Sequence, residues 1–95
     1  MSESILSEAE RLVGGDRNLA YGDGVVEWNK IADIFSTMTG KRITASEAVT
    51  LIMIMKLVRE CNNPKRDNLV DLCGYALIAS RIQRDVQEES QLLEQ

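Results

Sequence analysis

The stretch LIMIMKLVRE, residues 51–60, decides how this chain folds. Five consecutive apolar side chains lead into Lys56, and two more apolar residues separate it from Arg59. Two cations therefore lie within an otherwise apolar segment. Each needs an anionic partner, because leaving a charge buried and unpaired costs several kcal/mol.

The residues before this stretch predict where its helix begins. The sequence TASE, residues 44–47, is a capping box, in which the Thr44 hydroxyl and the Glu47 carboxylate each accept a hydrogen bond from the other residue's backbone N–H. We therefore predict a helix from there to about Cys61, before Asn-Asn-Pro ends it. Residues 48–55 are apolar on every side, so this helix must be surrounded, either at the centre of a bundle or by a second copy of the chain.

Apolar residues at spacings of three and four predict the other helices. With the helix above, they cover residues 4–13, 25–38, 44–61 and the chain from about 64–67 onward. Residues 14–24 carry four glycines and predict a long loop, a kind of segment that is often functional. Residues 88–95 form an acidic tail that we expect to fray. The prediction is one all-α domain over residues 1–95, a four-helix unit completed by homo-oligomerisation through the apolar third helix.

Composition excludes several classes of function. The net charge of −4 would repel a phosphate backbone over most of the surface, so we expect no duplex nucleic acid as a partner. The chain has no apolar run of about 18 residues and its N-terminus is acidic, so we expect a cytoplasmic protein without membrane contact. Cys61 and Cys73 form no CxxC pair and histidine is absent, so we expect two reduced thiols, no zinc site and no imidazole acid or base.

Positive charge gathers in the middle of the chain. Residues 41–66 contain six basic and two acidic side chains, a local surplus that can attract a compact anion. On the last helix Asp67, Asp71 and Tyr75 recur every four residues and share a face. Two interpretations stay open: Lys56 or Arg59 pairs with Asp71 only to fix helix packing, or these residues line a pocket for a phosphate, a ribose hydroxyl, a base edge or a metal.

The loop and the next helix add further candidates. Arg17 offers a planar fork for phosphate beside Asp16, and Tyr21 offers a stacking surface before a glycine that permits close approach. The alternative is a turn with Arg17 solvated and Tyr21 covering the core. Trp28 is most simply a core residue, with stacking on a base as the second interpretation.

These segments together resemble a family of small, functionally unassigned phage and prophage proteins. The shared pattern is DR-x3-YG, then K-x2-R, then D-x3-D-x2-GY, across about residues 5–80. The family is distantly similar to phage domains associated with nucleotide modification and to MazG-like all-α nucleoside triphosphate pyrophosphohydrolases. The resemblance implies nucleotide contact in a helical oligomer by Asp16, Arg17, Tyr21, Lys56, Arg59, Asp67, Asp71 and Tyr75. The ExxE and ExxD motifs with which MazG-like enzymes bind Mg²⁺ are absent from this sequence.

Three functional hypotheses follow. The first is a non-catalytic homo-oligomer in the host cytoplasm that needs no cofactor and sequesters a nucleotide or cyclic-nucleotide-like signal of bacterial immunity. The second is a Mg²⁺-dependent nucleotide hydrolase or nucleotide-modification protein that uses Asp67, Asp71 and Asp16. The third is a structural oligomerisation module.

Overall fold

The computed structural model describes residues 3–14 and 24–94, and these ranges are helical apart from short connections. The helices are α1 (Ile5–Gly14), α3 (Gly24–Thr39), α4 (Ala45–Asn62) and α5 (Arg66–Glu94). The predicted all-α unit of four helices is thus confirmed for the described ranges. The segment predicted as a fraying tail is helical as far as Glu94.

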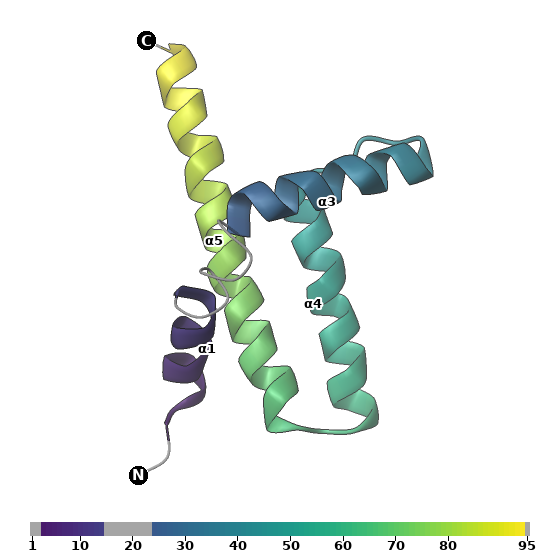
Figure 1. Cartoon of the computed structure of the whole chain (residues 1–95), viewed down its shortest axis with the longest axis vertical. Coiled ribbons are helices and arrows are strands. Elements are labelled where there is room, and N and C mark those ends of the chain that lie inside the picture. The colour runs from purple at the N-terminus through teal and green to yellow at the C-terminus, as the bar shows by residue number, and fades with distance from the viewer. Residues whose placement is uncertain (1–2, 15–23, 95) are drawn as a thin grey trace.

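The long helix α5 organises the arrangement (Figure 1). It packs against α4 on one side and α1 on the other, and α3 crosses the beginning of α4 to reach it. The last turns of α5 extend beyond the other helices. Among the described helices, none is long and apolar enough to cross a membrane.

Helix α4 begins where its capping box predicts. The Thr44 side chain accepts from the Glu47 backbone N–H at 3.1 Å, and Glu47 accepts from the Thr44 backbone N–H at 3.1 Å. These bonds satisfy backbone donors that a helix start leaves without partners. At the other end the Asn63 backbone N–H donates to the Arg59 carbonyl at 2.9 Å.

The Ser36 hydroxyl links the connection between α3 and α4 to the body of α3. The Ile43 backbone N–H donates to Ser36 Oγ at 2.8 Å, while Ser36 Oγ donates to the Ala32 carbonyl at 2.8 Å. Gly40 ends α3 with φ of +71°, a left-handed conformation that glycine adopts without strain. The turn therefore fixes how α3 lies across α4.

The core of the described residues consists mainly of small side chains. The buried apolar residues are Ala9, Val13, Trp28, Ala32, Ala45, Ala48, Val49, Val70 and Ile82. Several larger aliphatic side chains of α4 are instead about half exposed, among them Ile54 and Val58. This distribution is the reverse of the usual one, in which leucine and isoleucine fill the interior.

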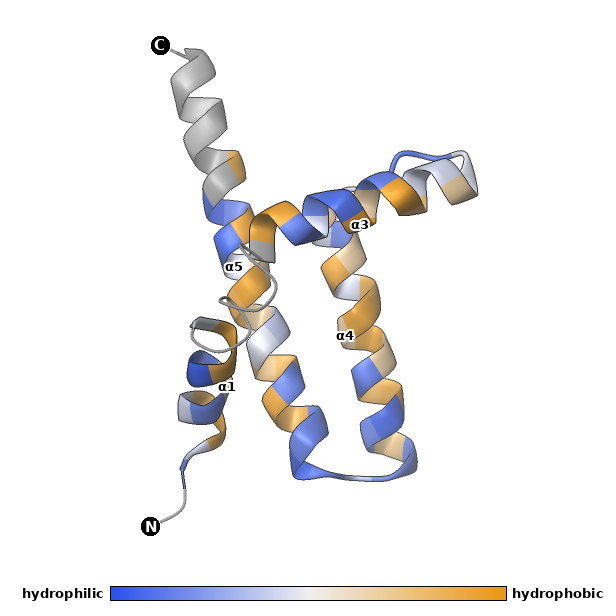
Figure 2. Ribbon diagram, in the orientation of Figure 1, coloured by the Kyte–Doolittle hydropathy of each residue, from blue (hydrophilic) through white to orange (hydrophobic). Residues whose placement is uncertain are grey.

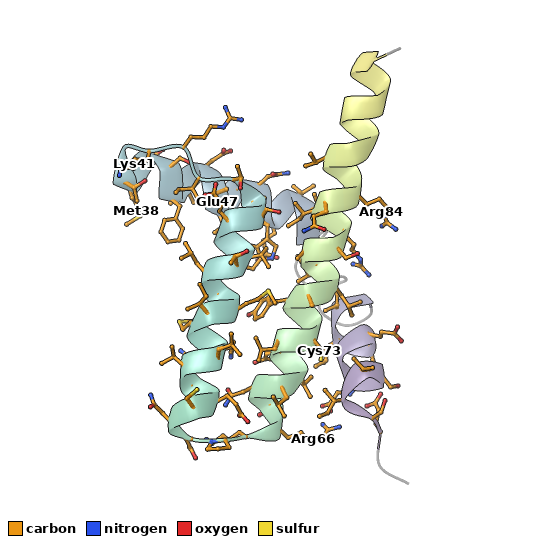
Figure 3. The ribbon with its side chains drawn as sticks, turned by 180° about the vertical axis from the view of Figure 1, so that it is seen from behind. Met38, Lys41, Glu47, Arg66, Cys73 and Arg84 are labelled. Carbon is orange, nitrogen blue, oxygen red and sulfur yellow. The ribbon has the colours of Figure 1, made fainter. Side chains whose placement is uncertain are left out.

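Two ion pairs involve the N-terminal segment. Arg66, at the start of α5, pairs with Glu8 of α1 and donates to the Glu3 carbonyl at 2.8 Å (Figure 3). Arg11 pairs with Glu3 at 3.2 Å, and its hydrogen bond holds the pKa of the Glu3 carboxyl below its usual value. The Arg66 contacts tie the N-terminal segment to the beginning of α5.

Glycine lets α1 approach α5 closely. A Cβ added at Gly74 would lie 3.2 Å from Val13 Cγ2, a tight contact with a buried side chain. In a helix interior Gly→Ala gains about 0.5–1 kcal/mol, but here the crowding opposes that gain. We expect Gly74→Ala to stabilise the Val13→Ala variant by about 1 kcal/mol and the wild-type chain by clearly less. A urea-denaturation double-mutant cycle measures this difference, and equal effects in both backgrounds would contradict the close contact.

Candidate functional site

The centre of the candidate site is an ion pair between α4 and α5. Lys56 Nζ lies 2.8 Å from Asp71 Oδ2, and the two side chains are only 15% and 20% exposed. Lys56 lies seven residues after the buried Val49, two helical turns along the same side of α4, which faces α5. The sequence predicted an anionic partner for Lys56, and the structure places Asp71 there.

Arg59 does not share this environment. It is exposed, and no carboxylate of the described residues lies within ion-pair distance of it. The expectation of an anionic partner is confirmed for Lys56, whereas Arg59 has no such partner among the described residues. Residues three apart on an α-helix point about 60° away from each other, so Arg59 points in another direction than Lys56. The partly buried side of α4 continues from Lys56 to Glu60, at a spacing of four, and leaves Arg59 facing solvent.

One aromatic side chain, Tyr75, lies close to the ion pair along the sequence of α5, and it contacts a second one, Trp28 of α3. Tyr75 follows Asp71 by one helical turn, and its ring meets that of Trp28 edge to face, with centroids 6.0 Å apart. Trp28 is only 7% exposed and belongs to the core cluster, with Tyr75 packed against that cluster. Trp28 therefore occupies the core position that was its simpler interpretation, and its stacking on a base stays a prediction.

Asp67 lies apart from this pair. It is exposed in the first turn of α5, where a carboxylate interacts favourably with the helix dipole. The structure describes no group of three or more acidic or cysteine side chains placed to hold a metal ion in residues 3–14 and 24–94. Asp16, Arg17 and Tyr21 lie outside these described residues, so their predicted roles stay predictions.

Sequence reasoning missed two polar residues next to the site. Glu60 accepts a hydrogen bond from the Lys65 backbone N–H at 2.8 Å and from the Asn68 side-chain amide at 3.3 Å. Asn68 is the buried polar residue among the described ones, at 8% exposure, and it also donates to the Asn63 carbonyl at 3.4 Å. The signal available was the spacing of four from Lys56 to Glu60. Glu60 and Asn68 together hold the turn between α4 and α5, and this turn places Lys56 opposite Asp71.

This arrangement suits a binding mode in which an anionic ligand replaces Asp71 as the partner of Lys56. An entering anion can take the place of Asp71 at the Lys56 ammonium, and the released carboxylate can then accept from a ligand hydroxyl. The Tyr75 ring and hydroxyl lie one turn further along α5. Arg59 adds a solvent-facing guanidinium to α4, the helix that carries Lys56.

Comparison with known proteins places the chain among phage sequences. It is 40% identical over 83 residues to the Gene 55 protein of Mycobacterium phage D29, covering 86% of this chain and 55% of that protein. It is 29% identical over 82 residues to the Gene 55 protein of Mycobacterium phage L5, covering 84% of this chain and 53% of that protein. The chain thus spans about half the length of these curated relatives.

No solved structure matches this chain. The predicted resemblance to small phage proteins is supported by the two phage relatives, whereas the similarity to MazG-like enzymes stays a prediction. A family profile covers residues 4–83, which is most of the chain. The chain therefore belongs to the family described as Domain of unknown function (DUF6378).

Proposed function

We propose that this protein is a non-catalytic phage nucleotide-binding protein that sequesters a nucleotide-derived signal of bacterial immunity. The observation that carries the proposal is the pairing of Lys56 with Asp71, 2.8 Å apart and mostly covered, one helical turn from Tyr75. A cation, a carboxylate and an aromatic hydroxyl are the groups that recognise a phosphate, a ribose and a base.

The surrounding charge supports an anionic ligand. Arg59 and Lys65 are exposed near the end of α4 that carries Lys56, and they belong to the segment with the positive surplus, in a chain with a net charge of −4. Such a local field attracts a small anion, while the acidic remainder of the surface disfavours long nucleic acids. Under this proposal Arg17 and Tyr21 of the loop add a phosphate fork and a stacking surface.

The hydrolase hypothesis places different demands on the same residues. It requires Asp71 and Asp67 to coordinate Mg²⁺ together, whereas Asp71 is paired with Lys56 and Asp67 is exposed at the helix start. A carboxylate shared with a lysine is a weaker metal ligand, because the ammonium competes with the cation for the same oxygen atoms. Binding without turnover therefore fits Asp71 better.

A nucleotide panel tests the proposal. Linear and cyclic nucleotides are incubated with the protein and Mg²⁺, and both the melting temperature and the recovered nucleotide are measured. We expect at least one nucleotide to raise the melting temperature, since a ligand at 100 times its Kd stabilises by about 2.7 kcal/mol, and we expect it to be recovered intact.

Variants identify the residues responsible. Lys56→Met should abolish the ligand-induced shift in melting temperature, whereas Lys65→Met, at an exposed lysine of the same basic segment, should retain it. If no nucleotide shifts the melting temperature, the proposal is wrong. Turnover that Asp71→Asn abolishes would establish the hydrolase instead.

A further inference from the structure

An exposed apolar surface covers the outer side of α4 and the adjoining end of α3. Its members are between 38% and 80% exposed: Phe35, Met38, Leu51, Ile54, Met55, Leu57 and Val58. The end of α3 extends past α4 (Figure 1), and Met38 lies on that extending part (Figure 3). Figure 2 shows the middle of α4 as a largely hydrophobic stretch. We call these seven residues the outer surface.

The outer surface has a regular helical pattern. Leu51, Ile54, Met55 and Val58 recur at spacings of three, one and three, which places them on one side of a helix. Val49, on the other side of α4, is fully buried against the rest of the chain. Helix α4 therefore carries two apolar sides, and the described part of the chain covers one of them.

The size of this surface matches what a stable protein interface needs. Seven large apolar side chains that are each about half exposed present on the order of 600 Å² of apolar area. The largest apolar patch of an ordinary monomer is about 300–600 Å². A standard interface buries about 800 Å² per partner, somewhat more than half of it apolar. The outer surface can thus supply the whole apolar centre of such an interface.

We propose that a second copy of this chain covers the outer surface, with the two α4 helices antiparallel about a two-fold axis. Two observations favour a second copy. The small-residue core of one chain leaves the larger aliphatic side chains outside, as expected for half of a shared core. The pattern is also self-complementary, since in antiparallel register Leu51 of one copy meets Val58 of the other around Ile54 and Met55.

Charge favours the antiparallel orientation. Glu47 lies near the beginning of α4 and Arg59 near its end, both exposed, so antiparallel helices bring each Glu47 within about one turn of the other copy's Arg59. Parallel helices would set Glu47 beside Glu47 and Arg59 beside Arg59. The opposed helix dipoles add a small contribution in the same direction. This inference does not require a nucleotide.

Gel filtration with light scattering tests the surface. The wild-type chain is expected at twice the 10.6 kDa of one chain, and Ile54→Glu at 10.6 kDa with its helical circular dichroism retained. Leu6→Glu, at an exposed apolar residue of α1 outside the outer surface, should remain a dimer. A wild-type chain that is monomeric at every concentration overturns the proposal, as does a dimer that persists in the folded Ile54→Glu variant.

Cysteine cross-linking tests the orientation and does not depend on the variants above. In a Cys61→Ser and Cys73→Ser background, Leu51→Cys mixed with Val58→Cys should form a disulfide-linked dimer when oxidised with copper phenanthroline. Leu51→Cys alone should not, because two copies of residue 51 would lie about 10 Å apart along antiparallel helices, beyond the Cα separation that a disulfide bridges. Efficient self-linking of Leu51→Cys overturns the antiparallel arrangement.

Discussion

Replacing Trp28 by alanine is expected to lower the free energy of unfolding by about 3–5 kcal/mol, the usual effect of truncating a buried tryptophan. Trp28 is 7% exposed and is the bulkiest side chain of a core that otherwise consists mostly of alanine and valine. These small neighbours cannot expand to fill the space that the indole leaves. A typical domain has a free energy of unfolding of about 5–15 kcal/mol in total, so this loss is a large share of it.

Urea denaturation followed by circular dichroism measures this effect. Fluorescence is unsuitable, because Trp28 is the chain's one tryptophan. Trp28→Phe should cost clearly less, since a ring remains to fill the core and to meet Tyr75. The matched control is Leu6→Ala, an exposed apolar truncation on α1, which should change stability by about 0.5 kcal/mol or less. Protein concentration is held constant, because self-association would add to the apparent stability. A loss below about 1 kcal/mol would contradict the buried core position of Trp28.

The beginning of α4 could be predicted from the sequence because its cause is local. The capping box links Thr44 to Glu47 through hydrogen bonds within one helical turn, and the structure contains both bonds. Gly40 is another local signal, since a glycine with positive φ follows the end of α3 at Thr39, one residue after the predicted end at residue 38. Neither signal contains information on how α3 crosses α4. That depends on contacts such as the one between Ile43 and Ser36, which no pattern in the sequence singles out.

Packing on two sides limited the prediction of α5. Helical spacing in the sequence places Leu69 on an apolar stripe of this helix, with Leu72, Ala76 and Ala79, and places Val70 beside that stripe. In the structure Val70 is 2% exposed and Leu69 is 38% exposed. The reason is that α5 packs against α4 on one side and against α1 on the other, where Gly74 admits Val13. A single helical stripe describes a helix with one neighbour, so it cannot rank the residues of a helix with two.

The candidate site shows the same division between local and tertiary information. A need for an anionic partner at Lys56 follows from its apolar surroundings in the sequence, and Asp71 was one of the partners predicted. The outward position of Arg59 depends on where α4 and α5 touch, which the sequence pattern does not contain. Glu60 and Asn68 were missed because their hydrogen bonds form only once the α4–α5 turn is made.

Removing Asp71 alone is expected to destabilise the protein by about 2–3 kcal/mol, because Lys56 would keep its charge in a mostly covered position without a partner. This value lies below the about 3–5 kcal/mol typical of fully buried pairs, since the two side chains are still 15% and 20% exposed. Urea denaturation of Asp71→Ala measures the loss. The control is Glu3→Ala, which removes the exposed pair with Arg11 and should cost much less than Asp71→Ala.

The double variant Lys56→Met with Asp71→Leu separates structure from binding. Apolar side chains of similar volume often replace a covered ion pair without loss of stability, so the double variant should unfold within about 1 kcal/mol of the wild type. If the pair only fixes the packing of α4 on α5, no property of the protein should then change. If Lys56 is the phosphate ligand, the stable double variant should lose every nucleotide-induced shift in melting temperature. If the stable double variant still binds nucleotide, the ion pair serves helix packing and a residue other than Lys56 contacts the phosphate.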